Sequence, residues 1–253
     1  DEGRWYLGTL LYEARRPAEC ERAFALDLEA KPEAGPAWAL RGLCAFDAGE
    51  HAVAAAHLEN GLQLGLAGNA ELIRAARARL PLALLKTGQF ERAVEGYTHL
   101  ARTSPETTPG LLEEIGLLLL RTPALPSEIP GDRRGFVRQV GRAGYLHLSL
   151  KGEEAGKAYA DLVSAHPREP WVHYAYGVFL LRTDSEKALA ELRRELEVQP
   201  ENVMAHLEIA FELILRGDHG AARHHAERAV ALAPGLFAAQ NALGRALVEA
   251  GEL

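Results

Sequence analysis

Three arginines spaced four residues apart, Arg134, Arg138 and Arg142, are the clearest candidates for a charged binding site. Residues four apart lie on one face of a helix, so the three guanidinium groups would form a single stripe. Guanidinium groups hold carboxylates and phosphates through a planar fork of N–H donors, which makes the stripe a candidate anion site. The alternative is a solvated face that is partly paired with acidic side chains close in sequence: Asp132, Glu153 and Glu154.

The ten histidines contain one local group, His219, His224 and His225. Neighbouring positions on a helix diverge by about 100°, so His224 and His225 cannot both face a metal held by His219. We expect these histidines to lie on the surface. The chain has no nucleophile elbow, P-loop, zinc-protease or dinucleotide-binding motif. We therefore expect no catalytic residues, no cofactor and no metal site.

Aromatic residues concentrate in residues 170–179, with the sequence PWVHYAYGVF. On a helix, Trp171, Tyr174 and Val178 share one face, whereas Tyr176 and Phe179 turn toward the expected core. Tryptophan, tyrosine and arginine dominate the binding energy of protein interfaces, so the first face is a candidate binding surface. The alternative is that these aromatics belong to the core, as aromatics at helical spacing often do.

The composition favours helices throughout. The 253 residues include 44 Ala and 41 Leu but only 11 Val and 5 Ile. Alanine and leucine favour helices, whereas β-branched residues favour strands. An all-β fold is therefore excluded.

The charge is acidic and evenly spread, with a formal net charge of −7. Residues 1–126 carry 13 basic and 17 acidic side chains, and residues 127–253 carry 15 and 18. Without a basic region to neutralise phosphates, we expect no nucleic-acid partner. The longest apolar run, residues 115–120, is far shorter than the roughly 18 residues of a membrane span. The 23 Arg and 5 Lys suggest a GC-rich bacterial genome.

Residue types recur along the chain at a spacing of 34. Gly8 recurs as Gly42, Pro200 as Pro234 and Gly217 as Gly251. Between the two later prolines, apolar residues follow the helical period on both sides of Gly217, which predicts two helices joined by a turn. One such hairpin cannot bury its apolar face alone, so successive hairpins must stack.

This pattern resembles the tetratricopeptide repeat, a 34-residue unit with aromatic, glycine, alanine and proline residues at fixed offsets. The matching residues are Leu7, Gly8, Leu11, Phe24 and Pro32; Trp38, Gly42, Gly49, Ala54 and Leu58; Gly88, Phe90, Ala93 and Tyr97; and Leu243, Gly244, Leu247 and Gly251. The resemblance covers about four-fifths of the chain. It implies an all-α, right-handed superhelical solenoid of about six antiparallel helix hairpins plus one terminal helix.

In this family the first helix of each repeat lines a concave groove that receives extended peptides or partner helices. The resemblance implies that the groove would contain Trp5, Tyr12, Trp171, Tyr174, Arg182, Phe211, Asn241 and Arg245. We therefore expect a scaffold or adaptor that binds a protein or peptide partner. The alternatives are the non-catalytic region of a larger glycosyl- or sulfotransferase-type enzyme, an assembly factor for an envelope complex, and a groove for a small apolar ligand.

The regular pattern breaks near the middle of the chain. Pro123, Pro126, Pro130 and Gly131 argue against a helix in residues 122–133, so only three helices are predicted there: 110–121, 134–151 and 153–165. We expect one continuous solenoid, with three hairpins at 1–107, a divergent half-repeat plus Pro-rich insertion at 108–135, and three hairpins plus a terminal helix at 136–253. The insertion is either functional or a degenerate repeat. Pro81 should kink its helix.

Cys20 and Cys44 should lie level with each other if their helices run antiparallel about Pro32. Packed helix axes are about 8–10 Å apart, whereas a disulfide needs Cα atoms about 4.4–6.8 Å apart. We therefore expect two neighbouring buried thiols, with a disulfide as the alternative.

The last predicted helix, about 236–250, carries a packing stripe of Ala239, Leu243, Ala246 and Leu247. Residues 251–253 have the pattern of a turn into a further helix, and solenoids usually end in a polar cap. We therefore expect the natural protein to continue, with one exposed apolar side on this helix; the alternative is an end-to-end contact with another molecule. The first residue is Asp1 and the only methionine is Met204, so a signal peptide cannot be assessed, and both cytoplasmic and exported locations stay open.

Overall fold

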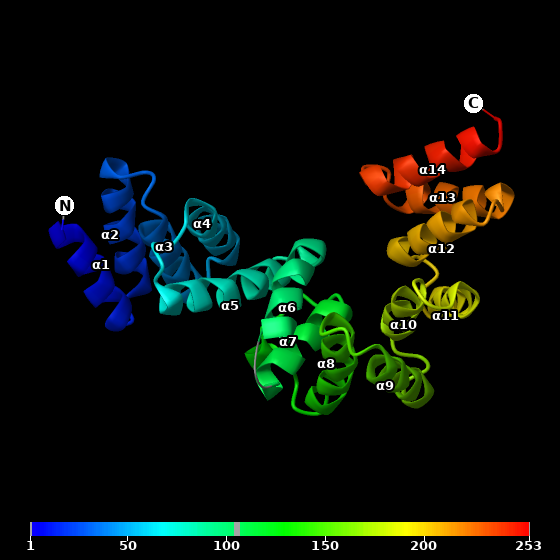
Figure 1. Cartoon of the computed structure of the whole chain (residues 1–253), viewed down its shortest axis with the longest axis horizontal. Coiled ribbons are helices and arrows are strands. Elements are labelled where there is room, and N and C mark those ends of the chain that lie inside the picture. Colours follow the sequence, from blue (N-terminus) through cyan, green and yellow to red (C-terminus); the bar gives the residue numbers. More distant parts are fainter. Residues whose placement is uncertain (1, 104–106, 253) are drawn as a thin grey trace. The chain divides into compact units, whose positions relative to one another are not determined.

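The computed structural model describes residues 2–103 and 107–252, and every regular element in these ranges is helical (Figure 1). Asp1, residues 104–106 and Leu253 lie outside the described residues. The helices are α1 (Glu2–Glu13), α2 (Pro17–Ala30), α3 (Gly35–Asp47), α4 (His51–Leu64), α5 (Ala70–Lys86), α6 (Phe90–Thr103), α7 (Pro109–Leu119), the 3₁₀ turn η1 (Pro126–Glu128), α8 (Arg134–Leu148), α9 (Gly152–Ala165), α10 (Val172–Leu180), α11 (Ser185–Val198), α12 (Val203–Leu215), α13 (His219–Leu232) and α14 (Phe237–Glu249). The all-α prediction is confirmed.

The chain divides into two compact units, residues 1–141 and 142–253, and α8 runs through the division. In the N-terminal unit, α1 packs with α2, α3 with α4, and α5 with α6. In the C-terminal unit, α10 packs with α11 and α12 with α13, and α14 packs against both α12 and α13. Each of these pairs is a helical hairpin of the predicted kind.

Glycine in the first helix of a hairpin makes room for a large side chain of the second. A Cβ atom at Gly8 would lie 2.7 Å from the ring of Phe24, and one at Gly42 would lie 2.7 Å from the Leu58 side chain. Both separations are too short for carbon atoms, so only glycine permits this helix spacing. Gly8 and Gly42 are therefore packing residues, whereas Gly217 and Gly251 are turn residues with φ of +78° and +74°.

In the third hairpin, α5–α6, the positions are reversed: the larger residue lies on the first helix and the glycine on the second. Pro81 occupies the corresponding position, and α5 continues through it as one helix of 17 residues. On the facing helix α6 stands Gly96, where a Cβ atom would lie 2.8 Å from the Cβ of Pro81. The proline ring thus fills the space that a side chain at position 96 would otherwise take.

A hydrogen bond recurs at the start of several first helices. In each case a side chain near the beginning of the helix bonds through an N–H group to a proline carbonyl six residues earlier. The pairs are Trp38 with Pro32 (2.8 Å), His173 with Pro167 (3.1 Å), His206 with Pro200 (3.1 Å) and Gln240 with Pro234 (3.1 Å). Indole, imidazole and carboxamide groups all supply the N–H, so the position is structurally equivalent although its residue type varies.

The middle of the chain contains the three predicted helices, α7, α8 and α9, and its Pro-rich segment is irregular as predicted. Lys86 on α5 binds the Glu128 carboxylate at 2.6 and 2.7 Å, and that carboxylate also accepts from the Leu125 backbone N–H at 2.6 Å. Ile129 is buried. The segment after α7 is therefore anchored to α5 by the Lys86–Glu128 ion pair, and it buries the side chain of Ile129.

The prediction of free thiols is wrong, because Cys20 and Cys44 form a disulfide. The two residues are fully buried neighbours, as expected, and their Cα atoms lie 5.9 Å apart. The error came from comparing the distance between helix axes with a distance between Cα atoms. Each Cα lies about 2.3 Å from its axis, so two residues that face each other are several Å closer than the axes.

Candidate functional site

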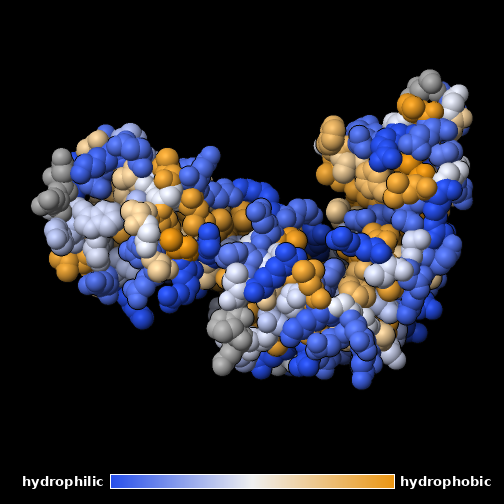
Figure 2. Space-filling view, viewed as in Figure 1, coloured by the Kyte–Doolittle hydropathy of each residue, from blue (hydrophilic) through white to orange (hydrophobic). Residues whose placement is uncertain are grey.

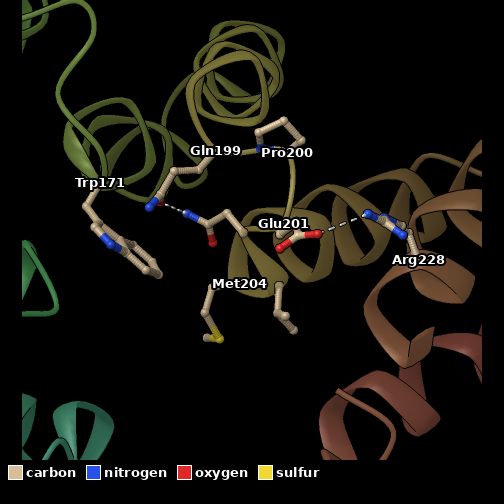
Figure 3. Close-up of a pocket in the computed structure, with 8 residues that line it drawn as sticks. Trp171, Gln199, Pro200, Glu201, Met204 and Arg228 are labelled. Carbon is tan, nitrogen blue, oxygen red and sulfur yellow. Dashed lines mark hydrogen bonds and ion pairs between the residues drawn. The ribbon is translucent and has the colours of Figure 1, made fainter. Parts of the chain in front are cut away.

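The starts of α10 and α12 line an open pocket of about 680 Å³ in the C-terminal unit (Figure 3). Its lining residues are Trp171, Gln199, Pro200, Glu201, Asn202, Val203, Met204 and Arg228. The Trp171 indole and the Met204 thioether form an apolar side of the pocket. Across the pocket, the Glu201 carboxylate lies 4.0 Å from the Arg228 guanidinium. The pocket therefore offers an apolar surface beside a pair of opposite charges.

A buried carboxylate from α11 holds the two sides of the pocket together. Glu195 is fully buried and accepts hydrogen bonds from the backbone N–H groups of Trp171 (2.8 Å) and Tyr174 (3.1 Å). Such N–H groups at a helix start lack partners within the helix, and the helix dipole favours negative charge there. Glu195 also accepts from the Asn202 side chain at 3.2 Å, and Asn202 caps α12 by accepting from Ala205 N–H at 3.1 Å. Glu195 thus ties the start of α10 to the start of α12.

Trp171 adopts a backbone conformation that residues other than glycine rarely take. Its φ is +71°, in the left-handed region, where an L-residue is less stable by roughly 1–2 kcal/mol. Its ring packs edge-on against Tyr174, with centroids 5.3 Å apart. Tyr174, which the sequence placed on the binding face, is only 7% exposed and belongs to the core. Tyr174 is therefore a core residue against which the Trp171 ring packs.

Further apolar side chains extend this surface along the first helices of the C-terminal unit. The members are partly exposed and pack on one buried core: Trp171, Val178, Leu181, Met204 and Phe211. We call this set the apolar strip. At the end of α12, Leu215 is 76% exposed. Figure 2 shows apolar surface gathered over the region of α12 to α14.

The strip repeats with the hairpins that carry it. Trp171 at the start of α10 corresponds to Met204 at the start of α12, one repeat later, and Val178 corresponds to Phe211 in the same way. The helix hairpin therefore recurs once per repeat, and a small residue in its first helix lets the two helices pack closely. This hairpin is the repeat unit that the sequence pattern predicts. The fold is an all-α repeat of stacked helix hairpins, similar to that of tetratricopeptide-repeat proteins.

Several solved tetratricopeptide structures are similar to the chain. The TPR2AB domain of yeast Sti1 in a pHSP90 complex is 15% identical, with a TM-score of 0.40 and coverage of 99% of this chain and 98% of that one. The TPR domain of P58(IPK) is 16% identical, with a TM-score of 0.42 and coverage of 99% and 67%. The protein TTC0263 of Thermus thermophilus is 20% identical, with a TM-score of 0.40 and coverage of 82% and 95%. No protein-family profile and no curated protein matches the chain.

The other predicted groove residues of the C-terminal unit lie apart from the pocket lining. Arg182 is exposed just after α10, and Asn241 and Arg245 are exposed on α14. The Arg245 guanidinium lies 3.6 Å from the Glu249 carboxylate on the same helix. Their membership of a common binding surface stays a prediction.

The N-terminal unit holds the remaining two predicted groove residues. Trp5 is half-buried and packs edge-on against Phe24, with ring centroids 5.6 Å apart. Tyr12 is half-buried and lines a separate cavity of about 620 Å³, together with Arg79 and Asp47. Burial and Asp47 raise the pKa of the Tyr12 hydroxyl, while Arg79 opposes them.

In the predicted arginine stripe, two of the three arginines form ion pairs with a buried carboxylate of the same fold. Arg134 binds the buried Glu113 carboxylate at 2.8 Å and also donates to the carbonyls of Pro126 (3.1 Å) and Ile129 (3.2 Å). Arg138 binds the other Glu113 oxygen at 2.6 and 2.8 Å. The acidic partner is thus on α7 and is not one of the neighbours expected from the sequence. An external anion would have to displace Glu113.

Sequence reasoning missed Glu195, Asn202 and Arg228, which shape the pocket. One signal was available, because Glu195 precedes Ala229 by one repeat and takes the place of that small buried residue. A carboxylate at such a position requires hydrogen-bond donors nearby, and the start of α10 supplies them. Among the described residues, no group of three or more His, Cys, Asp or Glu side chains is arranged to hold a metal, and no helix is long and apolar enough to cross a membrane.

Proposed function

We propose that this helix-hairpin repeat protein is a scaffold that binds a segment of a partner protein along the apolar strip. One large apolar side chain of that segment would enter the pocket beside Trp171. The pocket volume of about 680 Å³ lies within the range of small-molecule binding pockets, roughly 300–1,000 Å³, and leaves room for a large apolar side chain. The solved structures above include one of a tetratricopeptide domain with a bound partner, the yeast Sti1 complex.

The observation that carries the proposal is the conformation of Trp171. Residues other than glycine in this conformation concentrate at functional sites. Trp171 is the aromatic member of a set that also contains Arg15, Ala67, Arg121 and Leu150. Glu195 stabilises this conformation at Trp171 by accepting its N–H, and the result is an indole that lines an open pocket. A buried tryptophan contact of this kind typically contributes about 2 kcal/mol or more to the binding free energy of an interface.

The test is selection of binding peptides from a random display library, followed by measurement of their dissociation constants by fluorescence anisotropy. We expect the selected peptides to carry a large apolar residue and to bind Trp171→Ala at least about 30-fold more weakly, which corresponds to about 2 kcal/mol. The matched control is Tyr6→Ala, which removes an aromatic ring that is 66% exposed in the other unit. Equal binding by wild type, Trp171→Ala and Tyr6→Ala would contradict the proposal.

Two further functions expected from the sequence, the non-catalytic region of a larger enzyme and an assembly factor, would use the same surface to hold a protein. The binding assay therefore tests what all three share. A small apolar ligand is the different case: it would enter the pocket without needing Val178, Leu181 or Phe211. Loss of peptide binding in Phe211→Ala as well as in Trp171→Ala distinguishes a bound segment from such a ligand.

A further inference from the structure

Two histidines, His206 and His225, lie next to the part of the pocket lining that residues 200–204 form. His206 on α12 is 6% exposed, and its Nδ1 atom lies 3.0 Å from Nδ1 of His225 on α13. The other ring nitrogen of His206, Nε2, lies 3.1 Å from the carbonyl oxygen of Pro200, which lines the pocket. The expectation that His225 lies on the surface is therefore wrong, because this half-buried ring is held between two helices.

These contacts determine where the protons are. The Pro200 carbonyl can only accept, so Nε2 of His206 carries a proton. Neutral His206 then presents an unprotonated Nδ1, and the short contact is a hydrogen bond in which Nδ1–H of His225 donates. One further proton on His206 keeps the hydrogen bond only if His225 moves its own proton to Nε2 and accepts, whereas protonation of both rings sets two N–H groups face to face. The contact between α12 and α13 therefore requires that at least one of the two imidazoles stays neutral, and acid works against it.

The preceding repeat has the opposite arrangement at the equivalent positions. His173 also contacts a proline carbonyl, that of Pro167, but its Nδ1 faces the buried Glu191 carboxylate at 2.7 Å. A carboxylate accepts, so both ring nitrogens of His173 can donate at once. The hydrogen bond to Glu191 is the main cause that raises the pKa of His173. Acid therefore strengthens this contact between α10 and α11.

We propose that acid opens the pocket from one side. Between pH 7 and pH 5 the α12–α13 hairpin loosens, together with the Pro200–Met204 wall, while the α10–α11 hairpin that carries Trp171 stays closed. This regulation rests on the proposed function of the pocket, and it would release a bound apolar segment under mildly acidic conditions.

The charges around the two histidines act in the same direction. Burial is the main cause that lowers the pKa of His225 to about 4, and His206, His224 and Arg193 of α11 lower it further. Burial also lowers the pKa of His206, with added repulsion from Arg228 and His224 of α13, against the Pro200 carbonyl, which raises it. Because these pKa values are depressed in the folded state, stability is lost as the pH falls from about 6.5 toward 4.

The test is amide hydrogen exchange of the whole chain at pH 7 and pH 5, expressed as protection factors so that the intrinsic effect of pH cancels. A fall in the pKa of His225 from its ordinary value to about 4 lowers the equilibrium constant for closing of the hairpin about 30-fold at pH 5, and the protection factors fall with it. His225 is only half-buried, so we expect solvent screening to reduce this to about tenfold for amides of residues 200–232. Amides of residues 172–198 should keep or gain protection.

Two variants reproduce side-chain pairs that occur at equivalent positions in the neighbouring repeats. His225→Glu reproduces the His173–Glu191 pair, and His206→Gln reproduces the Gln240 side chain, which donates to Pro234 without titrating near neutral pH. We expect His225→Glu to abolish the tenfold loss, and His206→Gln to reduce it only in part, because burial still lowers the pKa of His225. The matched control, His219→Gln, removes a histidine of α13 that is not among the groups shifting either pKa, and it should keep the loss.

Equal changes in both hairpins of the wild type would overturn the proposal, as would a selective loss that persists in His225→Glu. The exchange is measured without any peptide. Failure of the acid response is thus separate from failure of the proposed peptide binding, which is measured at pH 7.

Discussion

Replacing Glu195 by glutamine tests whether a buried carboxylate holds the pocket together. The substitution keeps the shape of the side chain but exchanges one acceptor oxygen for an NH₂ group. One Glu195 oxygen serves Trp171 N–H and Asn202, and the other serves Tyr174 N–H. If the glutamine oxygen keeps the first pair, its NH₂ group faces the Tyr174 N–H, and that buried donor loses its acceptor.

The magnitude follows from these contacts. A buried donor left unpaired destabilises a fold by about 1–3 kcal/mol. Loss of negative charge at the start of α10 adds about 0.3–1 kcal/mol. Relief from burying an ion opposes both effects. We expect Glu195→Gln to lower the free energy of unfolding by about 2 kcal/mol.

The measurement is urea unfolding combined with hydrogen exchange at the Tyr174 amide, whose protection should fall in Glu195→Gln. The matched control is Glu197→Gln, two residues along α11 and exposed, which should change stability by less than about 0.5 kcal/mol. If Glu195→Gln unfolds at the same urea concentration as Glu197→Gln and retains the Tyr174 protection, the carboxylate does not hold the start of α10.

Three further outcomes are expected. Reduction of the Cys20–Cys44 disulfide, or its replacement by two serines, should lower the free energy of unfolding by about 3.5 kcal/mol, given a sequence separation of 24; a urea midpoint unaffected by reductant would contradict the bond. Burial raises the pKa of Glu114 to about 7, so its ionisation destabilises the fold as the pH rises from about 4.5 through 7. Glu114→Gln should therefore stabilise the protein by about 2–3 kcal/mol at pH 8 and by little at pH 5. Equal shifts of the melting temperature at both pH values would refute this. Gly96→Ala should destabilise by about 1–3 kcal/mol through collision with Pro81, and an unchanged melting temperature would show that α5 and α6 can move apart.

The helices were predictable because their signals are local. Proline and glycine punctuation gave α7, α8 and α9 within a few residues, and the last predicted helix agrees with α14. The division of aromatics between faces was also local: Tyr176, predicted to face the core, is 3% exposed and stacks on Tyr159. Helical periodicity decides which face of its own helix a side chain occupies, and no more than that.

The contacts that build the site were not predictable from periodicity. Glu113 meets Arg138 across 25 residues, Glu195 meets Trp171 across 24, and His206 meets His225 across 19. Each contact depends on the axial offset between two packed helices, and a slip of one residue rotates a side chain by about 100°. The binding face was predicted only in part for the same reason, since Tyr174 supports Trp171 from the core.

The pairing of Pro81 with Gly96 constrains the order in which these two residues could have been acquired. A proline at position 81 opposite any side chain at position 96 brings carbon atoms within 2.8 Å, whereas glycine at both positions leaves only a small gap. The change to glycine at position 96 is therefore the permissive step and must come first. A descendant that regained a side chain at position 96 would first need glycine at position 81, because the 2.8 Å contact is with the Cβ atom, which every other residue also has. Each of the two positions therefore limits which substitutions the other can accept.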